Sequence, residues 1–347
     1  MKYIYLYILL STLFVCCYSN NKKVPNVSHI SIHLTVQHFE QDFFSIDTNH
    51  IVESIHTLHK KYPQFWKDFT ENILGIDAYQ PNNTEEEKAI RSFIKSYQSI
   101  KESTDKVFKD FNDIQKQIEE SFKYIHYYFP TYSLPKKIIT FIGPLDAFFH
   151  GTLDDYGDVL TQDAIAIGLQ LHLGKVNMLY TSPQGQALYP AYISKRFEPA
   201  YIPVNCIKNI IDDLYPDKTS AKPLIDQIID RGKRLYTLDQ IMPYTPDSLK
   251  IGYTQTQLEG CYAHESLIWS MFLRSDVLYT IEPSIIKNYI GNSPNTSELG
   301  NDAPGNIGLF VGWQIVKKYM QGNSITLDSL LKTDTRIIFE QSHYKPK

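Results

Sequence analysis

Alternating apolar and polar residues predict that the body of the chain opens with a half-buried strand between residues 29 and 39. Its apolar members recur at every second position: Ile30, Ile32, Leu34 and Val36. The period then lengthens to three and four residues, which is typical of amphipathic helices. Helices are expected to begin near four positions: Asn49, Pro63, Thr84 and Phe111. The chain up to about residue 130 is therefore predicted to be mainly helical.

A second change of pattern marks the middle of the chain. The β-branched run at 138–142 stops at Gly143-Pro144 and predicts a short strand, and a second buried strand is expected over 164–171. Helical spacing then returns over five stretches: 201–214, 222–241, 255–279, 282–290 and 305–321. Because no repeat or low-complexity linker interrupts this order, we expect one helix-dominated α+β domain with a small sheet over residues 28–347.

The residues before this body form a different pattern. Lys2 precedes a short apolar run that ends at two adjacent cysteines, after which the chain turns polar. Such a run is typical of a secretory leader and is too short to span a bilayer. With a cysteine at its end, it predicts a lipoprotein signal peptide over 1–16 and a tether over 17–27. We expect the acyl anchor, palmitate included, on Cys17, which follows the smaller residue, with Cys16 as the alternative.

Composition narrows the classes of partner and of structure. A hydrophobic fraction of 43% supports a sizeable core, and a net charge of −4 without a long block of one sign gives no reason to expect nucleic acid. Beyond the leader only Cys206 and Cys261 remain, so at most one disulfide can form between them. Gly305, Gly308 and Gly312 recur at intervals of three and four and predict a helix backbone packed closely against a neighbour.

Motifs for metal and cofactor chemistry are incomplete. His264-Glu265 begins the zincin pattern HExxH, but Ile268 occupies the place of the second histidine. The acidic loop 154–158 offers hard oxygen ligands, yet its spacing matches no EF-hand and favours a solvated turn. The sequence contains no G-x-S-x-G, phosphate-binding or dinucleotide-binding motif. We therefore expect neither a metal nor a cofactor.

Long ordered blocks extend over nearly the whole chain after the leader. The first half contains "FFSIDT", "NILGI", "DAIAIGLQLHLG" and "YISKRFEPAYI", and the second half contains "LIDQIIDRGKRLYTLDQIMPYTPDSLKIGYT", "HESLIW" and "APGNIGLFVGWQIVKKYM". In their order and length these blocks resemble the gliding-motility lipoprotein GldB family of Bacteroidetes. The resemblance implies a cell-envelope lipoprotein that is required for gliding motility, is linked to the type IX secretion machinery and has no established catalytic activity.

The GldB family is in turn distantly similar to zincin-type metallopeptidases, in which an HExxH helix precedes a helix that supplies a glutamate ligand from an I-x-E-G motif. Here the corresponding segment has Arg231 at the place of that carboxylate, and the preceding segment "AYIPVNCIKNII" contains no histidine. A guanidinium is positively charged and cannot bind Zn²⁺. The resemblance therefore implies a pseudoenzyme, a peptidase-like scaffold without its metal.

The leading hypothesis is a non-enzymatic envelope lipoprotein that binds or stabilises motility and secretion proteins. The residues after the lipidation site, "YSNNKK", lack the acidic pair that resembles a surface-export signal in these bacteria, which favours an orientation toward the periplasm. One alternative is a hydrolase that acts on envelope peptide or glycan through carboxylates such as Asp154, Asp158, Glu198 and Glu265. Another is a protein that binds a lipid or small molecule in a closed apolar cavity.

The most distinctive blocks supply candidates for the lining of a vestigial cleft: Tyr192, Arg196, Arg231, Glu265, Trp269, Asn301, Asp302 and Trp313. Each candidate has a structural alternative. Tryptophan on a helix is usually a core residue, arginine often forms an ion pair, and Asn301-Asp302 before Pro304 is a natural N-cap region.

Overall fold

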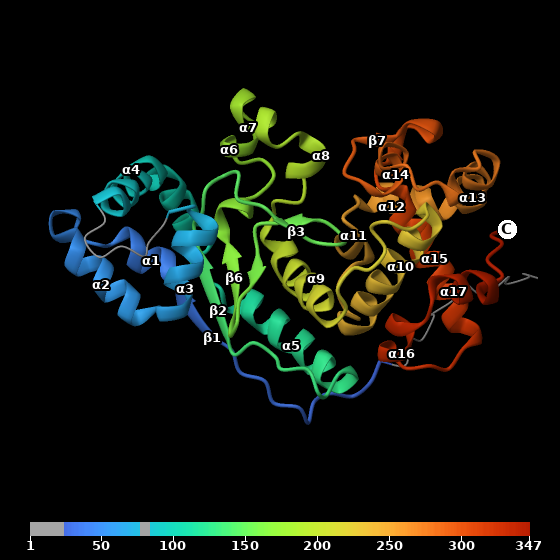
Figure 1. Ribbon diagram of the computed structural model, residues 1–347, viewed down its shortest axis with the longest axis horizontal. Helices are drawn as coiled ribbons and strands as arrows, with labels where there is room; N and C mark the ends of the chain where they lie inside the picture. The colour runs from blue at the N-terminus through green and yellow to red at the C-terminus, as the bar shows by residue number, and fades with distance from the viewer. Residues whose placement is uncertain (1–23, 77–83) are drawn as a thin grey trace, which may run out of the picture.

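The computed structural model describes residues 24–76 and 84–347, so both candidate lipidation sites, Cys16 and Cys17, lie outside the described part (Figure 1). Its centre is a four-stranded sheet in the order β1-β2-β6-β5. Strands β1, β2 and β6 are parallel, and β5 runs antiparallel to β6 at one edge. The bounds of these strands are Thr35–His38 (β1), Lys137–Phe141 (β2), Val159–Leu160 (β5) and Ala164–Gly168 (β6).

Helices surround the sheet and two small hairpins complete the described part of the chain. The helices before the last central strand are α1 (Phe39–Phe44), α2 (Ile51–Lys61), α3 (Pro63–Lys67), α4 (Thr84–Val107) and α5 (Asn112–Tyr128). Those after it are α6 (Met178–Thr181), α7 (Pro183–Leu188), α8 (Ala191–Ser194), α9 (Ile202–Leu214), α10 (Leu224–Ile241), α11 (Asp247–Ile251), α12 (Gln255–Ala263), α13 (Glu265–Arg274), α14 (Pro283–Ile290), α15 (Ile307–Gly322), α16 (Leu327–Lys332) and α17 (Thr335–Ser342). The hairpins pair β3 (Phe149–His150) with β4 (Asp155–Tyr156), and β7 (Asn295–Thr296) with β8 (Gly300–Pro304). This arrangement confirms the predicted helix-dominated α+β fold.

Alternate residues of the central strands pack on opposite faces of the sheet, as the period of two requires. Ile139 and Phe141 join an aromatic cluster with α1 and α3, whereas Ile138, Ile165 and Ile167 belong to the large core that extends through α5, α9, α10 and α15. Figure 1 shows the same division, with α1 to α4 on one side of the sheet and α5 and α9 on the other. The sheet therefore separates a small N-terminal layer from a larger C-terminal one.

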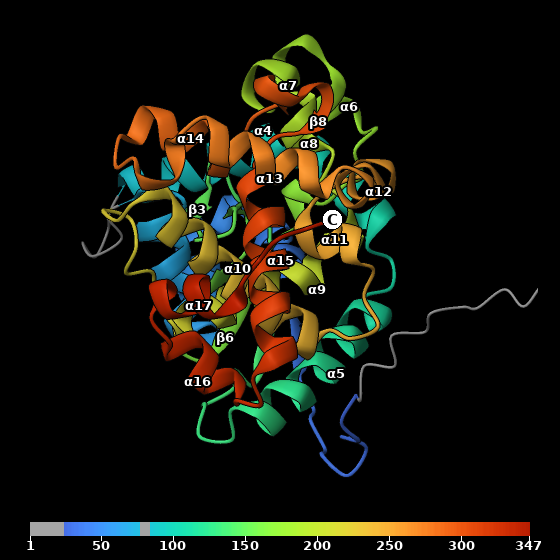
Figure 2. The ribbon, with the colours of Figure 1, turned by 90° about the vertical axis from the view of Figure 1, so that its right-hand side faces the viewer.

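Helices α10 and α15 cross with their backbones in contact, and Figure 2 shows α15 among the other C-terminal helices. A Cβ atom built on Gly312 would lie 1.9 Å from the carbonyl oxygen of Ile228, and one on Gly232 would lie 2.2 Å from the carbonyl oxygen of Gly312. Only glycine fits at this crossing, because any side chain would force the helices apart. The close packing predicted from the glycine spacing is thus confirmed for Gly308 and Gly312, while Gly305 precedes the helix and packs against Ser293.

The first predicted strand is shorter than its alternation suggested. Residues 29–34 do not pair with β2, and at Leu34 side chains of α5 bind the backbone groups that a ladder would use. Glu119 accepts a hydrogen bond from the Leu34 amide at 2.9 Å, and Gln115 donates one to the Leu34 carbonyl at 3.0 Å. The second buried strand also ends early, at Gly168, where residues 169–171 form a 3-10 turn.

The helix predicted over 255–279 is divided. It ends at Ala263 and resumes at Glu265, because His264 leaves helical geometry with φ of −119° and its ring Nδ1 lies 3.1 Å from the carbonyl oxygen of Gly260. A 3-10 turn at Val277–Tyr279 follows α13. The helices α1, α6 to α8, α11, α16 and α17 were not predicted from the sequence.

Two further features concern membrane-spanning helices and the two cysteines. In the described residues, no helix combines the length and apolarity that crossing a membrane requires. Cys206 and Cys261 are both buried free thiols, so the disulfide that the sequence allowed does not form.

Candidate functional site

A polar cleft of about 390 Å³ lies where the β3–β4 hairpin, α8 and the start of α9 meet. Two antiparallel strands place the acidic loop on one wall, and the end of the "YISKRF" block places Arg196 on the other. Asn292, from the turn after α14, completes the lining. The cleft therefore joins segments from both halves of the chain.

One cluster in the cleft bridges these segments. Arg196 forms an ion pair with Asp154 at 2.6 Å, and its second terminal nitrogen donates to the Asn292 side-chain oxygen at 3.2 Å. Asn292 in turn donates to Asp154 at 3.2 Å. The side chains of Arg196 and Asp154 keep exposures of 16% and 9%, so solvent still reaches this cluster. An ion pair in this setting is stronger than one on the open surface but is not fully desolvated.

A second cluster lies deeper, around Asp158. The sequence favoured a solvated turn for this acidic loop, but the Asp158 side chain is fully buried. Its carboxylate lies 3.0 Å from Nε2 of His172 and accepts hydrogen bonds from the Gly168 amide at 3.2 Å and from Asn205 at 3.0 Å. Asn209, one turn further along α9, donates to its backbone carbonyl at 3.0 Å. These bonds compensate the cost of burying the carboxylate and attach the acidic loop to α9 and to the end of β6.

Helix α9 also carries titratable groups whose pKa values are shifted by burial. Burial lowers the pKa of Lys208 to about 8, although Asp154 opposes the shift. Burial likewise raises the pKa of the Tyr201 hydroxyl to about 12 and that of the Cys206 thiol well above its ordinary value. The thiol of Cys206 is therefore protonated at neutral pH and is a poor nucleophile.

The chemistry that this cleft supports is limited. The described side chains that line it include no serine, threonine or cysteine that could serve as a nucleophile. Nδ1 of His172 is buried without a partner among the described residues, which leaves one acid–base group with unused capacity. No group of three or more His, Cys, Asp or Glu residues positioned to hold a metal ion occurs within 24–76 and 84–347.

The eight residues predicted to line one cleft do not meet in one place. Only Arg196 lines the cleft described above, and Tyr192 lies nearby on α8 outside its lining. Arg231 lines a separate small pocket between α10 and α14. Glu265 lies in a groove beside the C-terminal residues and accepts a hydrogen bond from Tyr344 at 2.7 Å.

The remaining four candidates take other structural roles. Asn301 and Asp302 are exposed residues of β8 that line a hollow against α12, and the N-cap of α15 is Asn306, not either of them. Trp269 and Trp313 are both buried, with exposures of 6% and 0%, which matches the core alternative. Sequence reasoning missed His172 and Asn205, because no fixed spacing relates either residue to Asp158 along the chain.

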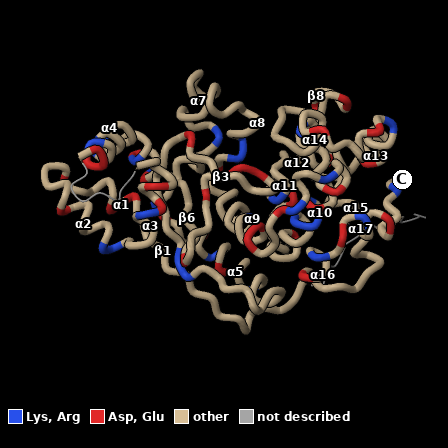
Figure 3. The backbone as a smooth tube through the Cα atoms, in the orientation of Figure 1, with Lys and Arg blue, Asp and Glu red and all other residues tan. Residues whose placement is uncertain are grey.

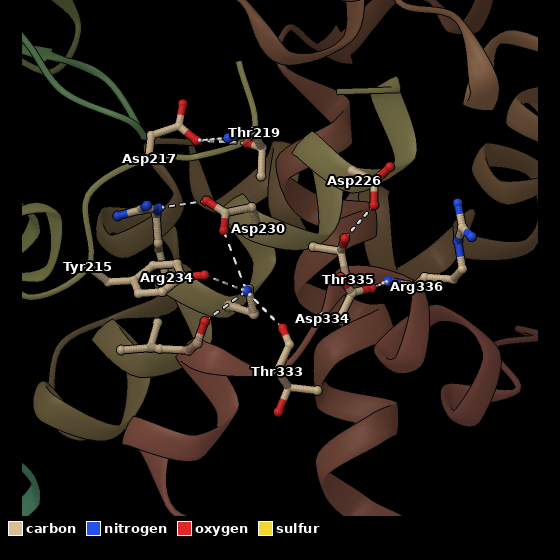
Figure 4. A network of polar contacts seen from close by, with 12 residues as sticks. Tyr215, Asp217, Thr219, Asp226, Asp230, Arg234, Thr333, Asp334, Thr335 and Arg336 are labelled. Carbon is tan, nitrogen blue, oxygen red and sulfur yellow. Dashed lines mark hydrogen bonds and ion pairs between the residues drawn. The ribbon is translucent and has the colours of Figure 1, made fainter. Parts of the chain in front are cut away.

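The longest sequence block, which supplies α10, forms a buried network of charges rather than a cleft (Figure 4). Arg234 is fully buried and binds Asp230 at 2.9 Å and Asp212 at 2.7 Å. Lys233 donates to the carbonyl oxygens of Leu331 at 2.9 Å and Thr333 at 3.2 Å, which attaches the end of α16 to α10. Figure 3 shows that acidic and basic residues gather around α10. Its ion pairs form within the fold, which is typical of a structural network, although Nη2 of Arg234 has no hydrogen-bond partner among the described residues.

One of three comparisons with known proteins matches this chain, and it agrees with the resemblance noted in the sequence. A comparison with curated proteins and a comparison with solved structures each found no match. The family model described as gliding motility protein GldB, a lipoprotein family, matches residues 20–346, which is nearly the whole chain. The chain therefore belongs to the GldB gliding motility family.

Proposed function

We propose that the protein is a non-enzymatic lipoprotein of the cell envelope that supports gliding motility and the type IX secretion machinery by binding and stabilising partner proteins. The observation that carries this proposal is the family match over residues 20–346. Gliding depends on assemblies in the envelope, and a member without chemistry of its own acts on them through contacts.

The geometry of the cleft supports binding over catalysis. Its charged side chains are bonded to one another, as in the contacts of Arg196 with Asp154 and Asn292. Paired groups of this kind hold a surface in a fixed shape, whereas a catalytic group needs free capacity aimed at a reacting atom. The bridge between the two halves of the chain also keeps the surface rigid, which reduces the entropy lost when a partner binds.

The anchor belongs to the same proposal. We infer that diacylglycerol and acyl chains on Cys17, or failing that on Cys16, fix the protein to a membrane with its folded body toward the periplasm. Two or more acyl chains anchor stably, whereas one binds only marginally. Mass spectrometry of the mature N-terminal peptide decides this point. An unmodified cysteine or a retained leader would contradict it.

The alternative of a hydrolase is favoured by one observation, the contact between Asp158 and His172. A carboxylate that orients a histidine is the arrangement of an acid–base pair, and Nδ1 of His172 has no partner among the described residues. The other three carboxylates named for this hypothesis have different partners: Asp154 binds Arg196, Glu198 contacts Lys175, and Glu265 contacts Tyr344. We still favour binding, because Asp154 in the lining is bound by Arg196 and Asn292 and no serine, threonine or cysteine is among the described lining residues. We also infer that the protein carries no zinc, which elemental analysis of protein purified without chelators tests.

Two variants separate the hypotheses in living cells. Arg196→Gln removes the bridge in the cleft, and His172→Gln removes the acid–base group. With abundance matched by immunoblotting, binding predicts that Arg196→Gln impairs gliding and the recovery of partners after gentle detergent extraction, while His172→Gln retains both. The matched control is Arg274→Gln, an exposed arginine on α13. Loss of gliding by His172→Gln at normal abundance and with partners retained would instead support a hydrolase.

A further inference from the structure

Arg231 and Arg234 lie three residues apart on α10 but differ in their partners. Arg234 binds two carboxylates and lies over the ring of Tyr215 at 5.3 Å. Among the described residues, no hydrogen bond or ion pair reaches the Arg231 guanidinium, and its Nε and Nη1 atoms are buried without a partner. Burial lowers the pKa of Arg231 below its ordinary value, and Asp217 offsets part of this shift. A buried charge without a partner is costly, so an unused arginine of this kind needs an explanation.

Arg231 lines a pocket of about 260 Å³ between α10, α14 and the loop before α10. Gln227 and Ser220 add polar groups, Lys287 adds a second positive charge, and the apolar wall comes from α14. The volume is below the range of drug-sized sites, so it suits a small group and not an extended ligand.

The carboxylates near this pocket have donors other than Arg231, although Asp217 uses only one of its two oxygens for them. Asp217 accepts hydrogen bonds from both the amide and the hydroxyl of Thr219 at 2.7 Å, and Asp230 binds Arg234 and lies 3.5 Å from Lys233. Two cations and one carboxylate therefore line the pocket, which leaves it with a positive charge. The fork of an arginine side chain matches the oxygen atoms of carboxylate and phosphate groups.

We propose that this pocket binds an oxyanion, a carboxylate or a phosphate, through Arg231 and Lys287. The site is separate from the cleft near Arg196 and does not depend on the proposed role in motility. An anion in the pocket would supply the partner that the fold itself does not give to Arg231.

The test is thermal unfolding of the purified full-length protein in a non-ionic detergent, titrated with sodium phosphate or sodium acetate at an ionic strength held constant with sodium chloride. The wild type is expected to gain melting temperature with the logarithm of anion concentration, because the ligand binds the folded state. A response to phosphate alone identifies a phosphate as the natural ligand group, and a response to acetate alone identifies a carboxylate. Arg231→Gln should lose the shift, Lys287→Gln should reduce it, and Arg274→Gln should retain it. An equal shift in Arg231→Gln, or no shift in the wild type with either anion, would overturn the proposal.

A second measurement needs no ligand. Without added anion, Arg231→Met should melt at a higher temperature than the wild type, because it removes a buried charge that has no partner. Arg234→Met should melt at a lower temperature, because it leaves Asp230 uncompensated. A decrease for Arg231→Met similar to that for Arg234→Met would mean that the fold already satisfies Arg231, and the anion site would be rejected.

Discussion

The cleft near Arg196 and the network along α10 both consist of arginine and aspartate, but they differ in how far water reaches them. The Arg196–Asp154 pair keeps exposures of 16% and 9%, whereas Arg234 and Asp230 are exposed by 0% and 1%. The cleft pair connects segments that meet at the surface. The α10 network lies beneath helices and attaches α16 and the loop after α9 to the core.

Within the proposed function, this difference separates a surface that a partner could reach from a buried network that holds the fold together. Removing one partner from a buried ion pair is strongly destabilising, while a partly solvated pair contributes less and its groups can be reached from outside. Of the sequence blocks shared with the GldB family, the longest therefore serves mainly to stabilise the fold. The shorter "YISKRF" block is the better place to look for contacts with a partner. Four predictions test this division.

The largest effect is expected at the crossing of α10 and α15. Gly312→Ala should lower the free energy of unfolding by roughly 4–5 kcal/mol, because the new methyl group would overlap the Ile228 carbonyl and must push two helix backbones apart. Urea denaturation measures the loss. Gly260→Ala is the matched control: its Cβ meets nothing within 4 Å on α12, so it should stabilise by about 0.5–1 kcal/mol. Equal behaviour of the two variants would contradict the close crossing.

The second-largest loss of stability is expected in the charge network on α10. Arg234→Gln is expected to cost about 3–5 kcal/mol, because two carboxylates lose their buried partner. Arg196→Gln in the cleft should cost only about 1–2 kcal/mol, because water can solvate Asp154 once the arginine is removed. Chemical denaturation of both variants gives the comparison directly. If Arg196→Gln costs as much as Arg234→Gln, the distinction between the two regions fails.

Lys208 is buried beneath the cleft, and its effect on stability should depend on pH. Its pKa is lowered from 10.5 to about 8 in the folded protein, so between these values the unfolded chain holds the extra proton and stability rises with pH. The buried charge costs about 3 kcal/mol, which is fully present below pH 8, where both states are protonated, and is relieved as the pH rises to 10.5. Lys208→Met should remove the rise. Urea denaturation at pH 7.5 and pH 10 should therefore show that the stability of the wild type relative to the variant rises with pH. A difference that stays constant would mean that Lys208 titrates normally.

The smallest effect is expected at Glu265. Its hydrogen bond from Tyr344 joins α13 to the C-terminal residues in an open groove, so Glu265→Gln should cost about 1 kcal/mol or less. Gliding should be retained, because the variant keeps an acceptor for the tyrosine hydroxyl. A variant present at normal abundance that cannot glide would show that this groove carries a function of its own.

The longer helices, the two central strands and the fold class could be predicted from the sequence alone. Helical spacing at α5, α9, α10, α14 and α15, and the β-branched run at β2, are local signals, because burial of one face imposes a period on neighbouring residues. The spacing of Gly308 and Gly312 likewise predicted that the backbone of α15 packs closely against its neighbours, since a larger residue does not fit there. The ordered blocks also identified the family.

Which polar residues meet could not be predicted from the sequence, because distant segments bring them together. Residues 29–34 carry the pattern of a strand, but side chains of α5, more than eighty positions away, bind Leu34 and prevent pairing. In the same way, Asp158 reads as part of a solvated turn, yet it lies buried against His172 and Asn205. A side chain's charge and hydrogen-bonding capacity follow from its residue type, which the sequence specifies. The partner that satisfies them is set by the packing of distant segments, which leaves no period or spacing along the chain.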